Sequence, residues 1–395
     1  MVKSIFISDL YGKKINKEYR FDEHINIVTG INGAGKTTFI KLVWYLISGN
    51  IERALEEIDF SYINLVHSMF TIEIERKNYD NSEINTIVTL ETSRERNELK
   101  MLTKQRSGNN SFKEYYKKIN DMNFAVLEYS KVSLFFPTFR RIEGGFFINE
   151  HISSYSYDKR TTNNQSGELT KLVTDIGNDL TVYNHKLIAS FSTDDIDELM
   201  KNEYLKISKK SLELNNEAMN KIKRIVTQNN QLTEEITKEK INEKNRLFNY
   251  ILELITDVDK KQKNNESPIN ELGNFINLLY HYKGIQFSDN ITVGDSNDAL
   301  VANKLSAGEK QMLSFLCYNA FLSNGIIFID EPELSLHVDW QRILIKTMIK
   351  QNASNQLIFA THSPFIYSQY EKYEIVIDEN KGDSNGKDNN LRRNS

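Results

Sequence analysis

The residues best suited to chemistry near the start of the chain run from Thr29 to Thr38 and fit the pattern G-x-x-x-x-G-K-[ST]. Glycines let backbone N–H groups converge on phosphate oxygens, and a following helix start adds partial positive charge. Lys36 would reach the β- and γ-phosphates of a nucleotide, and the Thr37 hydroxyl would ligate Mg²⁺. The residues predicted to contact the nucleotide here are Gly30, Asn32, Gly33, Ala34, Gly35, Lys36, Thr37 and Thr38.

The residues on either side of this loop predict the elements that would hold it in place. Residues 24–28 (HINIV) form an apolar run that is typical of a buried strand. Residues 36–47 have helical spacing, with apolar side chains at Phe39, Ile40 and Val43. A strand, a glycine-rich loop and a helix start, in this order, predict a cradle for phosphate.

Two further apolar runs are each followed by polar residues suited to catalysis. Residues 325–329 (GIIFI) predict a buried strand, and Asp330 and Glu331 follow it. This run resembles a Walker B motif, in which Asp330 would hold Mg²⁺ through water and Glu331 would act as general base. Residues 356–360 (QLIFA) predict another core strand, and His362 comes two residues after it.

Residues 305–311 (LSAGEKQ) precede a predicted helix and resemble the signature motif of ABC-type ATPases. A small hydroxyl and a bare backbone approach a phosphate closely, and the unpaired N–H groups of a helix start favour an anion. The resemblance implies that Ser306, Gly308 and Glu309 meet the γ-phosphate of ATP held by a different nucleotide-binding domain. Because the chain has one set of each motif, the resemblance implies a head-to-tail homodimer around two ATP molecules, or a larger assembly of such dimers.

The remaining motifs occur in the order of the same family. Residues 333–337 (ELSLH) stand at the position of its D-loop, and His362 resembles its switch histidine, which senses the γ-phosphate. The catalytic residues implied are Lys36, Glu331 and His362, and the metal-binding residues are Thr37 and Asp330. The family's Q-loop has no clear occupant, because no glutamine lies between Gln105 and Gln165. Arg140 or Arg141 could substitute for it, or could form a surface pair with Glu143.

Three details place the resemblance in one branch of the family. The Asn-Gly-Ala-Gly form of the phosphate loop, the run at 330–337 (DEPELSLH) and the Thr-His-Ser-Pro ending together resemble the SMC-like and OLD-like ATPases. This branch includes stand-alone ATPase subunits of bacterial anti-phage systems. The resemblance covers about residues 1–150 and 280–380 and says little about the segment between them.

The predicted fold is α/β: an ABC-type P-loop NTPase core, with a mixed sheet and antiparallel β hairpins, carrying a helical insertion. Residues 1–150 and 281–380 would form the two halves of the ATPase domain, residues 151–280 the insert, and residues 381–395 a disordered tail. Alternating patterns predict antiparallel pairs of strands at 2–8 with 18–21 and at 69–76 with 83–92. Residues 97–118 predict a loop and then a surface helix, 124–129 (FAVLEY) and 285–293 predict strands, and 271–282 a helix.

The insert is polar and helical in character, after a loop expected at 151–166. Two or three helices are predicted within 167–264, and arms of about 30 residues would reach roughly 45 Å. Its basic residues could touch DNA, although the interspersed acidic residues favour a solvated helix face. These basic residues are Lys201, Lys206, Lys209, Lys210, Lys221, Lys223 and Arg224. Tyr11, Tyr19 and Phe21 could stack on a nucleobase, but core packing is the more ordinary role for each.

Composition restricts the class of protein. A net charge of −4 in 395 residues does not suggest a general polyanion binder, so DNA contact would need a local patch. The single cysteine, Cys317, is expected to be a small buried apolar residue, and a chain without disulfides favours a reducing cytoplasm. No apolar run approaches the ~18 residues of a membrane span, so we expect a soluble protein with no membrane partner.

These observations favour a Mg²⁺-dependent ATPase, with ATP and Mg as cofactors, that dimerises around ATP. By resemblance it would regulate a separately encoded effector, a nuclease or toxin, in bacterial anti-phage defence. The alternative is an SMC-like DNA-repair or DNA-tethering ATPase, which would need long arms or a strongly basic surface. A transporter subunit is disfavoured by the large charged insert. A nuclease in its own right is disfavoured because few residues follow His362.

Overall fold

The computed structural model describes residues 1–10, 16–79, 83–102, 109–138, 181–188, 193–229, 238–280 and 305–377. The chain divides into two compact units. The first contains Met1–Ser192, Ser306–Met312 and Leu322–Ser395, and the second contains Thr193–Leu305 and Leu313–Phe321. Several predicted features lie outside the described residues: Tyr11, Arg140, Arg141, the loop at 151–166, the strand at 285–293 and the tail at 381–395.

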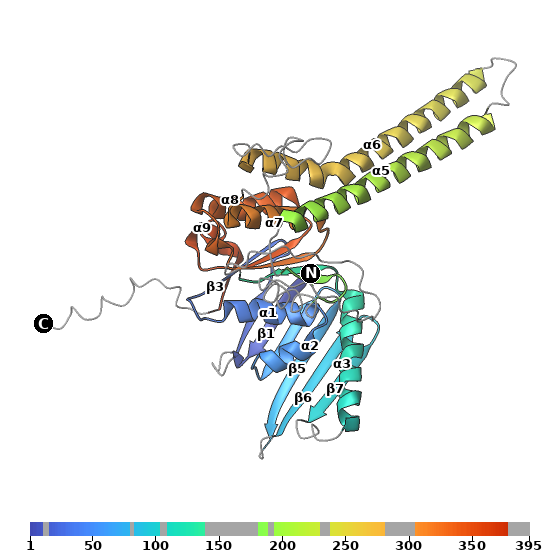
Figure 1. Cartoon of the computed structure of the whole chain (residues 1–395). Coiled ribbons are helices and arrows are strands. Elements are labelled where there is room, and N and C mark those ends of the chain that lie inside the picture. Colours follow the sequence, from blue (N-terminus) through green and yellow to red (C-terminus); the bar gives the residue numbers. More distant parts are fainter. Residues whose placement is uncertain are drawn as a thin grey trace, which may run out of the picture. The chain divides into compact units, whose positions relative to one another are not determined.

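A six-stranded parallel sheet in the first unit carries the predicted catalytic motifs, and Figure 1 labels its strand β3. Its strand order is β12-β3-β11-β10-β8-β9. Its strands are β3 (Ile25–Thr29), β8 (Ser133–Phe136), β9 (His185–Leu187), β10 (Ile326–Asp330), β11 (Gln356–Ala360) and β12 (Glu374–Val376). Every residue of β3, β8, β10 and β11 is buried, as expected of parallel strands covered on both faces. The predicted strands at 24–28, 325–329 and 356–360 are therefore confirmed within one residue at each end.

The second sheet of this unit is antiparallel, with strand order β2-β1-β4-β5-β6-β7. Its strands are β1 (Val2–Ser8), β2 (Asn16–Arg20), β4 (Tyr62–His67), β5 (Phe70–Tyr79), β6 (Glu83–Thr92) and β7 (Arg96–Leu102). Both predicted antiparallel pairs are present, because β1 pairs with β2 and β5 pairs with β6. The α/β core with antiparallel hairpins is thus confirmed.

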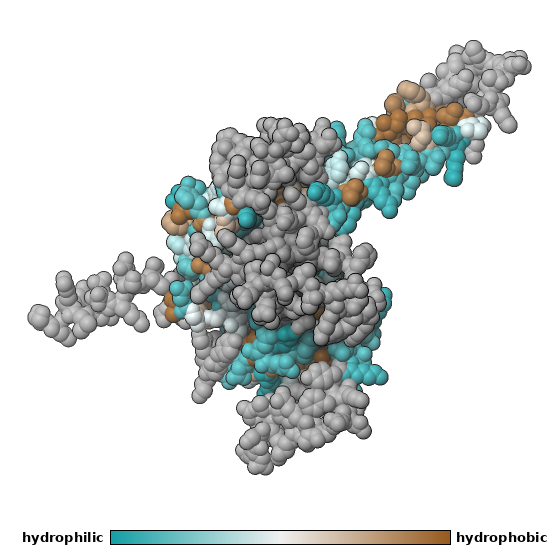
Figure 2. Space-filling view, viewed as in Figure 1, coloured by the Kyte–Doolittle hydropathy of each residue, from teal (hydrophilic) through white to brown (hydrophobic). Residues whose placement is uncertain are grey.

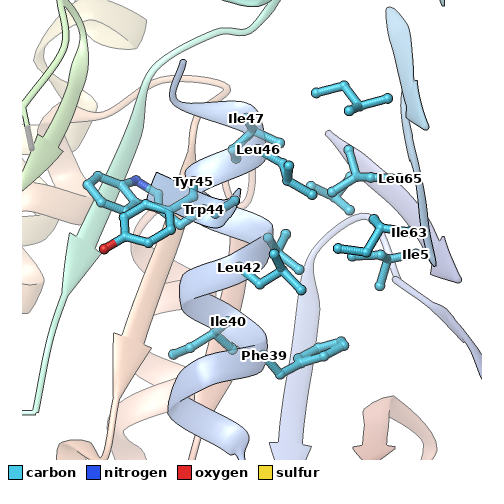
Figure 3. Packing of buried hydrophobic residues seen from close by; sticks show 14 of the residues in the cluster. Ile5, Phe39, Ile40, Leu42, Trp44, Tyr45, Leu46, Ile47, Ile63 and Leu65 are labelled. Carbon is cyan, nitrogen blue, oxygen red and sulfur yellow. The ribbon is translucent and has the colours of Figure 1, made fainter. Parts of the chain in front are cut away.

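Helix α1 (Lys36–Ile47) follows the phosphate loop and packs at the centre of the first unit. Figure 3 shows Leu42 and Leu46 directed toward Ile63 and Leu65 of the antiparallel sheet, with Trp44 on another side of the helix. The Trp44 indole N–H donates to the Ser133 hydroxyl of β8 at 3.0 Å. Sequence periodicity predicted one apolar face, whereas the structure buries this helix on nearly all sides, because both sheets contribute to its surroundings.

The sequence prediction was wrong for the segment that follows β6. Residues 97–118 were expected to start as a loop, but β7 occupies Arg96–Leu102. The strand expected at 124–129 is instead the end of helix α3 (Asn109–Tyr129). A buried face at Ile119, Met122 and Val126 has helical spacing, so the longer helical period overrides the short apolar run.

Shorter helices complete the first unit around the carboxyl-terminal strands. Helix α2 (Ile51–Glu57) follows α1, and α7 (Ala307–Phe321) begins in this unit. The others are η5 (Pro332–Leu334), α8 (Val338–Gln351), α9 (Pro364–Tyr367) and η6 (Glu371–Tyr373).

The second unit is dominated by the predicted helical insertion, a hairpin of α5 (Thr193–Asn229) and α6 (Lys238–Tyr280) (Figure 1). With 37 and 43 residues, these helices reach about 55 and 65 Å at 1.5 Å per residue. The helix expected at 271–282 is not separate, because α6 continues through Pro268 to Tyr280. The insert was expected to start at residue 151, yet β9 pairs with β8 in the parallel sheet and the helical unit starts at Thr193.

The surface of the hairpin carries both hydrophilic and hydrophobic residues (Figure 2). All seven basic residues singled out on α5 are exposed to solvent. Leu205, Leu212, Met219 and Val226 are also exposed and recur every seven residues along the same helix. None of the helices within the described ranges combines the length and the apolar character that spanning a bilayer requires.

Candidate functional site

The register of the parallel sheet explains why residues far apart in sequence meet at one edge. Asp330 pairs with Ala360, and Ala360 pairs with Val28, so the carboxyl ends of β10, β11 and β3 are level. The segments that leave these strands carry Glu331, His362 and the phosphate loop. The edge beyond the carboxyl ends of parallel strands is where α/β folds bind ligands.

The phosphate loop has the backbone conformation that its glycines permit. Gly33 and Gly35 have φ values of 81° and 96°, in the left-handed region where other residues are strained. The Lys36 side chain is buried, and its ammonium group donates to the carbonyl oxygens of Gly30 at 3.1 Å and Ile31 at 3.2 Å. The loop is thus closed over its own lysine, which could exchange these carbonyls for phosphate oxygens. Asn32 and Thr37 are exposed, and Thr38 is half-buried.

Asp330 is buried at the end of β10, and both of its carboxylate oxygens accept a hydroxyl hydrogen bond. Thr37 donates to Oδ1 at 3.1 Å, and Thr138 donates to Oδ2. Burial raises the pKa of Asp330 above its ordinary value, and the two hydroxyl hydrogen bonds oppose that shift.

The Thr37–Asp330 pair fits a magnesium ion. Mg²⁺ is commonly held by one or two carboxylates together with substrate phosphates and several waters, so it does not need a protein cage. Within the described ranges, no group of three or more His, Cys, Asp and Glu side chains could hold a metal. Thr37 and Asp330 could hold Mg²⁺ together with a phosphate ligand.

Glu331, directly after β10, has an unusual backbone conformation. Its φ of 46° and ψ of 57° lie in the left-handed region, which costs an L-residue about 1–2 kcal/mol. The Glu331 amide donates to the Ala360 carbonyl at 2.8 Å, so the neighbouring strand holds this conformation. Glu331 Oε1 lies 3.9 Å from His362 Nδ1. The strain sits where two predicted catalytic side chains meet, as is common at functional sites.

His362 lies closer to Glu333 than to Glu331, and no catalytic role was predicted for Glu333. One carboxylate oxygen of Glu333, Oε1, lies 2.9 Å from His362 Nδ1 and accepts the His362 backbone N–H at 2.8 Å. The other oxygen, Oε2, is buried without a hydrogen-bond partner. With Nδ1 facing Glu333, Nε2 is the ring atom left to meet a ligand.

Gln341 of α8 joins the D-loop to the segment that carries His362. Its amide nitrogen donates to the Leu336 carbonyl at 2.8 Å, and its amide oxygen accepts the Ser363 hydroxyl at 2.7 Å. Sequence analysis missed this residue. Its only signal was its position five residues after Leu336, on the helix that follows the D-loop.

The signature turn (residues 306–309) forms a capping box at the start of α7. The Ser306 amide donates to Glu309 Oε2 at 2.6 Å, and the Glu309 amide donates to the Ser306 hydroxyl at 3.3 Å. Glu309 is buried, whereas Ser306 is exposed. A Cβ added at Gly308 would lie 2.1 Å from the Ser335 carbonyl oxygen, so the turn packs against the D-loop backbone. The structure therefore directs the Glu309 carboxylate to its own helix cap.

Two side-chain predictions away from the motifs have clear structural outcomes. Tyr19 is buried, with its ring 4.9 Å from that of Phe39, and Phe21 stacks on Phe39 at 6.3 Å between ring centroids. Both side chains pack in or against the core, which is the more ordinary of their two predicted roles. Cys317 is buried, as expected.

A family model described as "AAA domain, putative AbiEii toxin, Type IV TA system" matches residues 25–368. The chain belongs to this AAA domain family. The matched range includes the phosphate loop, Asp330, Glu331 and His362, so the AAA domain takes in both strand ends and the helical hairpin between them.

Individual relatives of this AAA domain are distant. Over 100 residues, 22% of this chain, it is 29% identical to the "Retron Ec83 probable ATPase" of Escherichia coli, and the match spans 18% of that protein's length. Among solved structures, the Smc head domain with an extended coiled coil bound to the C-terminal domain of ScpA, from Pyrococcus furiosus, has a TM-score of 0.35 at 13% identity. That match covers 93% of this chain and 91% of the other. The recombination mediator protein RecF-ATPrS has a TM-score of 0.32 at 12% identity, with coverage of 93% and 94%.

Proposed function

We propose that this chain is a Mg²⁺-dependent ATP hydrolase that dimerises around ATP and regulates a separately encoded effector. The hydrogen bond between Thr37 and Asp330 carries the proposal, because it joins the phosphate loop to the strand end that precedes Glu331. A phosphate loop, a buried carboxylate and an adjacent glutamate within reach of a histidine are the parts that phosphoryl transfer to water requires. Membership in the AAA domain family supports the same activity.

Each residue would have a separate task in hydrolysis. The loop amides and the Lys36 ammonium would bind the phosphates, after Lys36 leaves the carbonyls of Gly30 and Ile31. Thr37 and Asp330 would hold Mg²⁺, which supplies charge neutralisation at the phosphates when bound. Glu331 would accept a proton from the attacking water while the bond between the γ-phosphorus and the β–γ bridging oxygen breaks. His362 would contact the γ-phosphate through Nε2.

The signature turn would complete the site of a second copy. Ser306 is exposed, and the helix start behind it has backbone N–H groups that favour an anion. A head-to-tail pair would place each signature turn on the ATP of the other subunit, so that two sites form together. ATP binding would then close the dimer, and hydrolysis would open it.

The effector would respond to this opening and closing of the dimer. Regulation of a nuclease or toxin in anti-phage defence is supported by the family description and by the retron ATPase relative. Both supports come from the names of related proteins, so this part of the proposal rests on relatedness. The exposed apolar side chains of α5, which include Leu205 and Leu212, would offer such an effector a surface to contact.

Replacement Glu331→Gln tests the catalytic part. It removes the base but keeps the shape of the side chain, so hydrolysis should fall by about 10²–10⁴-fold while ATP binding persists. Stalled hydrolysis should also trap the ATP-bound dimer, which light scattering after size-exclusion chromatography would detect. The matched control is Glu371→Gln on η6, which replaces an exposed carboxylate of the same unit that has no part in the proposed site.

Two results would contradict this proposal. Hydrolysis by Glu331→Gln at the wild-type rate would remove Glu331 from the role of base. Wild-type protein that binds no ATP in the presence of Mg²⁺ would exclude the proposed activity altogether.

A further inference from the structure

Thr138 contacts the same carboxylate as Thr37, that of Asp330, but comes from a different segment of the chain. It comes two residues after β8 (Ser133–Phe136), which pairs in parallel with β10. In the register of that pair, Phe136 lies opposite Ile329. The chain that leaves β8 therefore passes directly beside Asp330.

The contact between the two residues is specific to one oxygen. Thr138 donates its hydroxyl hydrogen to Asp330 Oδ2, while Thr37 donates to Oδ1 at 3.1 Å. Asp330 is 2% exposed, so its carboxylate depends on protein partners. Two hydroxyls, one from the start of α1 and one from the segment after β8, thus fix the plane of one buried carboxylate.

We propose that Thr138 is a positioning residue for Mg²⁺, which acts by orienting the Asp330 carboxylate. This inference rests on the proposed function, because it assumes that Asp330 and Thr37 hold Mg²⁺ beside a bound nucleotide. It assigns to the end of β8 a part in the metal site. Thr138 would also connect the segment that follows β8 to the phosphates through Asp330.

The chemistry of hydroxyls and carboxylates explains the choice of residue. Binding of Mg²⁺ demands near-ideal octahedral geometry, so a small rotation of a ligating or water-holding carboxylate weakens it. A hydrogen bond to the oxygen that does not face the phosphate loop restrains this rotation. Loss of a hydrogen-bond partner of a metal ligand commonly lowers metal affinity by about 10- to 100-fold.

The test compares Thr138→Val with Thr138→Ser by a measurement of metal binding. Mn²⁺ serves as the probe, and its binding to full-length protein loaded with ATP in the Glu331→Gln background is followed by electron paramagnetic resonance. We expect Thr138→Val to weaken Mn²⁺ binding about 10-fold or more and Thr138→Ser to retain it. ATP affinity without metal should be the same in both variants, because neither change alters the phosphate loop.

Ser133→Ala is the matched control. It removes a buried hydroxyl from the same strand, one that contacts Trp44 and His185 and not Asp330. It should leave Mn²⁺ affinity unchanged. Thr138→Ala replaces the valine variant if the latter does not fold, as judged by thermal denaturation.

The outcomes separate the inference from the proposed function. If ATP-loaded protein binds Mn²⁺ equally well with threonine, valine and alanine at position 138, the inference is wrong and the proposed function stands. If Ser133→Ala weakens Mn²⁺ binding as much as Thr138→Val does, the effect is a general loss of strand stability, and the inference is also wrong. If the Glu331→Gln protein with Thr138 intact binds no ATP, the proposed function itself is wrong, whatever the effect of changes at Thr138.

Discussion

The catalytic strand ends and the signature turn differ in what their polar groups contact. Around the strand ends, Thr37 of α1, Asp330, Glu333 of η5 and His362 are hydrogen-bonded to partners from other segments of the chain. In the signature turn, Ser306 and Glu309 are hydrogen-bonded to each other. One region is a network across the sheet, and the other is a local cap that presents an exposed serine.

This difference separates what one subunit holds by itself from what we propose a second subunit supplies. The strand ends already converge on a phosphate loop, so one chain contains the groups to bind a nucleotide. The signature turn packs on the Ser335 carbonyl of its own subunit at Gly308, while Ser306 is exposed. Changes in the two regions should therefore affect different steps.

The largest expected contrast is between Lys36→Ala and Ser306→Arg. Loss of the lysine should weaken ATP binding by about 10- to 100-fold, the value of one or more charged hydrogen bonds. The Ser306→Arg variant should fold and bind ATP, because Ser306 is exposed. Its rate of hydrolysis should fall by about 10²–10³-fold. Binding of a fluorescent ATP analogue and release of phosphate would measure the two steps separately.

Equal loss of ATP binding in both variants would contradict this contrast. Ala307→Ser is the control, because Ala307 is exposed and adjacent to Ser306 but is not proposed to contact ATP. It should behave as the wild type in both measurements.

A smaller effect is expected from Gly308→Ala, which tests how the signature turn rests on the D-loop. The added methyl group would lie 2.1 Å from the Ser335 carbonyl oxygen, so the turn must shift. Overpacking of this kind costs about 1–3 kcal/mol. Thermal denaturation should show this loss of stability, and hydrolysis should fall while ATP binding is retained. Wild-type stability and hydrolysis in this variant would show that the close contact has no role.

The last effect is on stability alone and concerns acid and two buried histidines, His185 of β9 and His67 of β4. Burial lowers the pKa of His185 to about 4 and that of His67 to about 3, from 6.5. Both should be neutral in the folded protein at pH 5, whereas the unfolded chain takes up protons below about pH 6.5. Stability should therefore fall as pH drops from about 6.5 toward 4, by up to about 1.4 kcal/mol per unit for each histidine.

Urea denaturation between pH 8 and pH 4.5 would measure this dependence. Stability should change little from these two residues above pH 7, where both states are neutral. Replacement of His185 by Gln should reduce the slope below pH 6.5. A slope that remains the same in this variant would show that groups other than His185 cause the pH dependence of stability.

Much of the site could be predicted from sequence because each motif is short and follows a recognisable strand. The apolar runs before Gly30, Asp330 and Thr361 are buried strands, and their parallel pairing brings the polar residues together. Thr138 was missed because its contact with Asp330 spans 192 positions and follows a four-residue strand. The contact depends on β8 lying next to β10 in the sheet. The periodicity of apolar residues does not show in which order strands lie in a sheet.

The errors in the fold have a similar cause. The apolar run at 124–129 looks like a strand by itself, but Ile119 and Met122 extend its pattern into a helix. Strand β9 has three residues, too few for alternation to be seen, and only its pairing with β8 defines it. Local pattern predicts an element well when the element is long, and poorly when a distant partner defines it.

The central claim, that two copies share their sites, is tested most directly by mixing two inactive variants. Lys36→Ala retains an intact signature turn, and Ser306→Arg retains an intact phosphate loop, so a mixed dimer contains one complete site. With random pairing in an equal mixture, hydrolysis should recover to about a quarter of the wild-type rate. A mixture that remains as inactive as its two components would contradict the shared site.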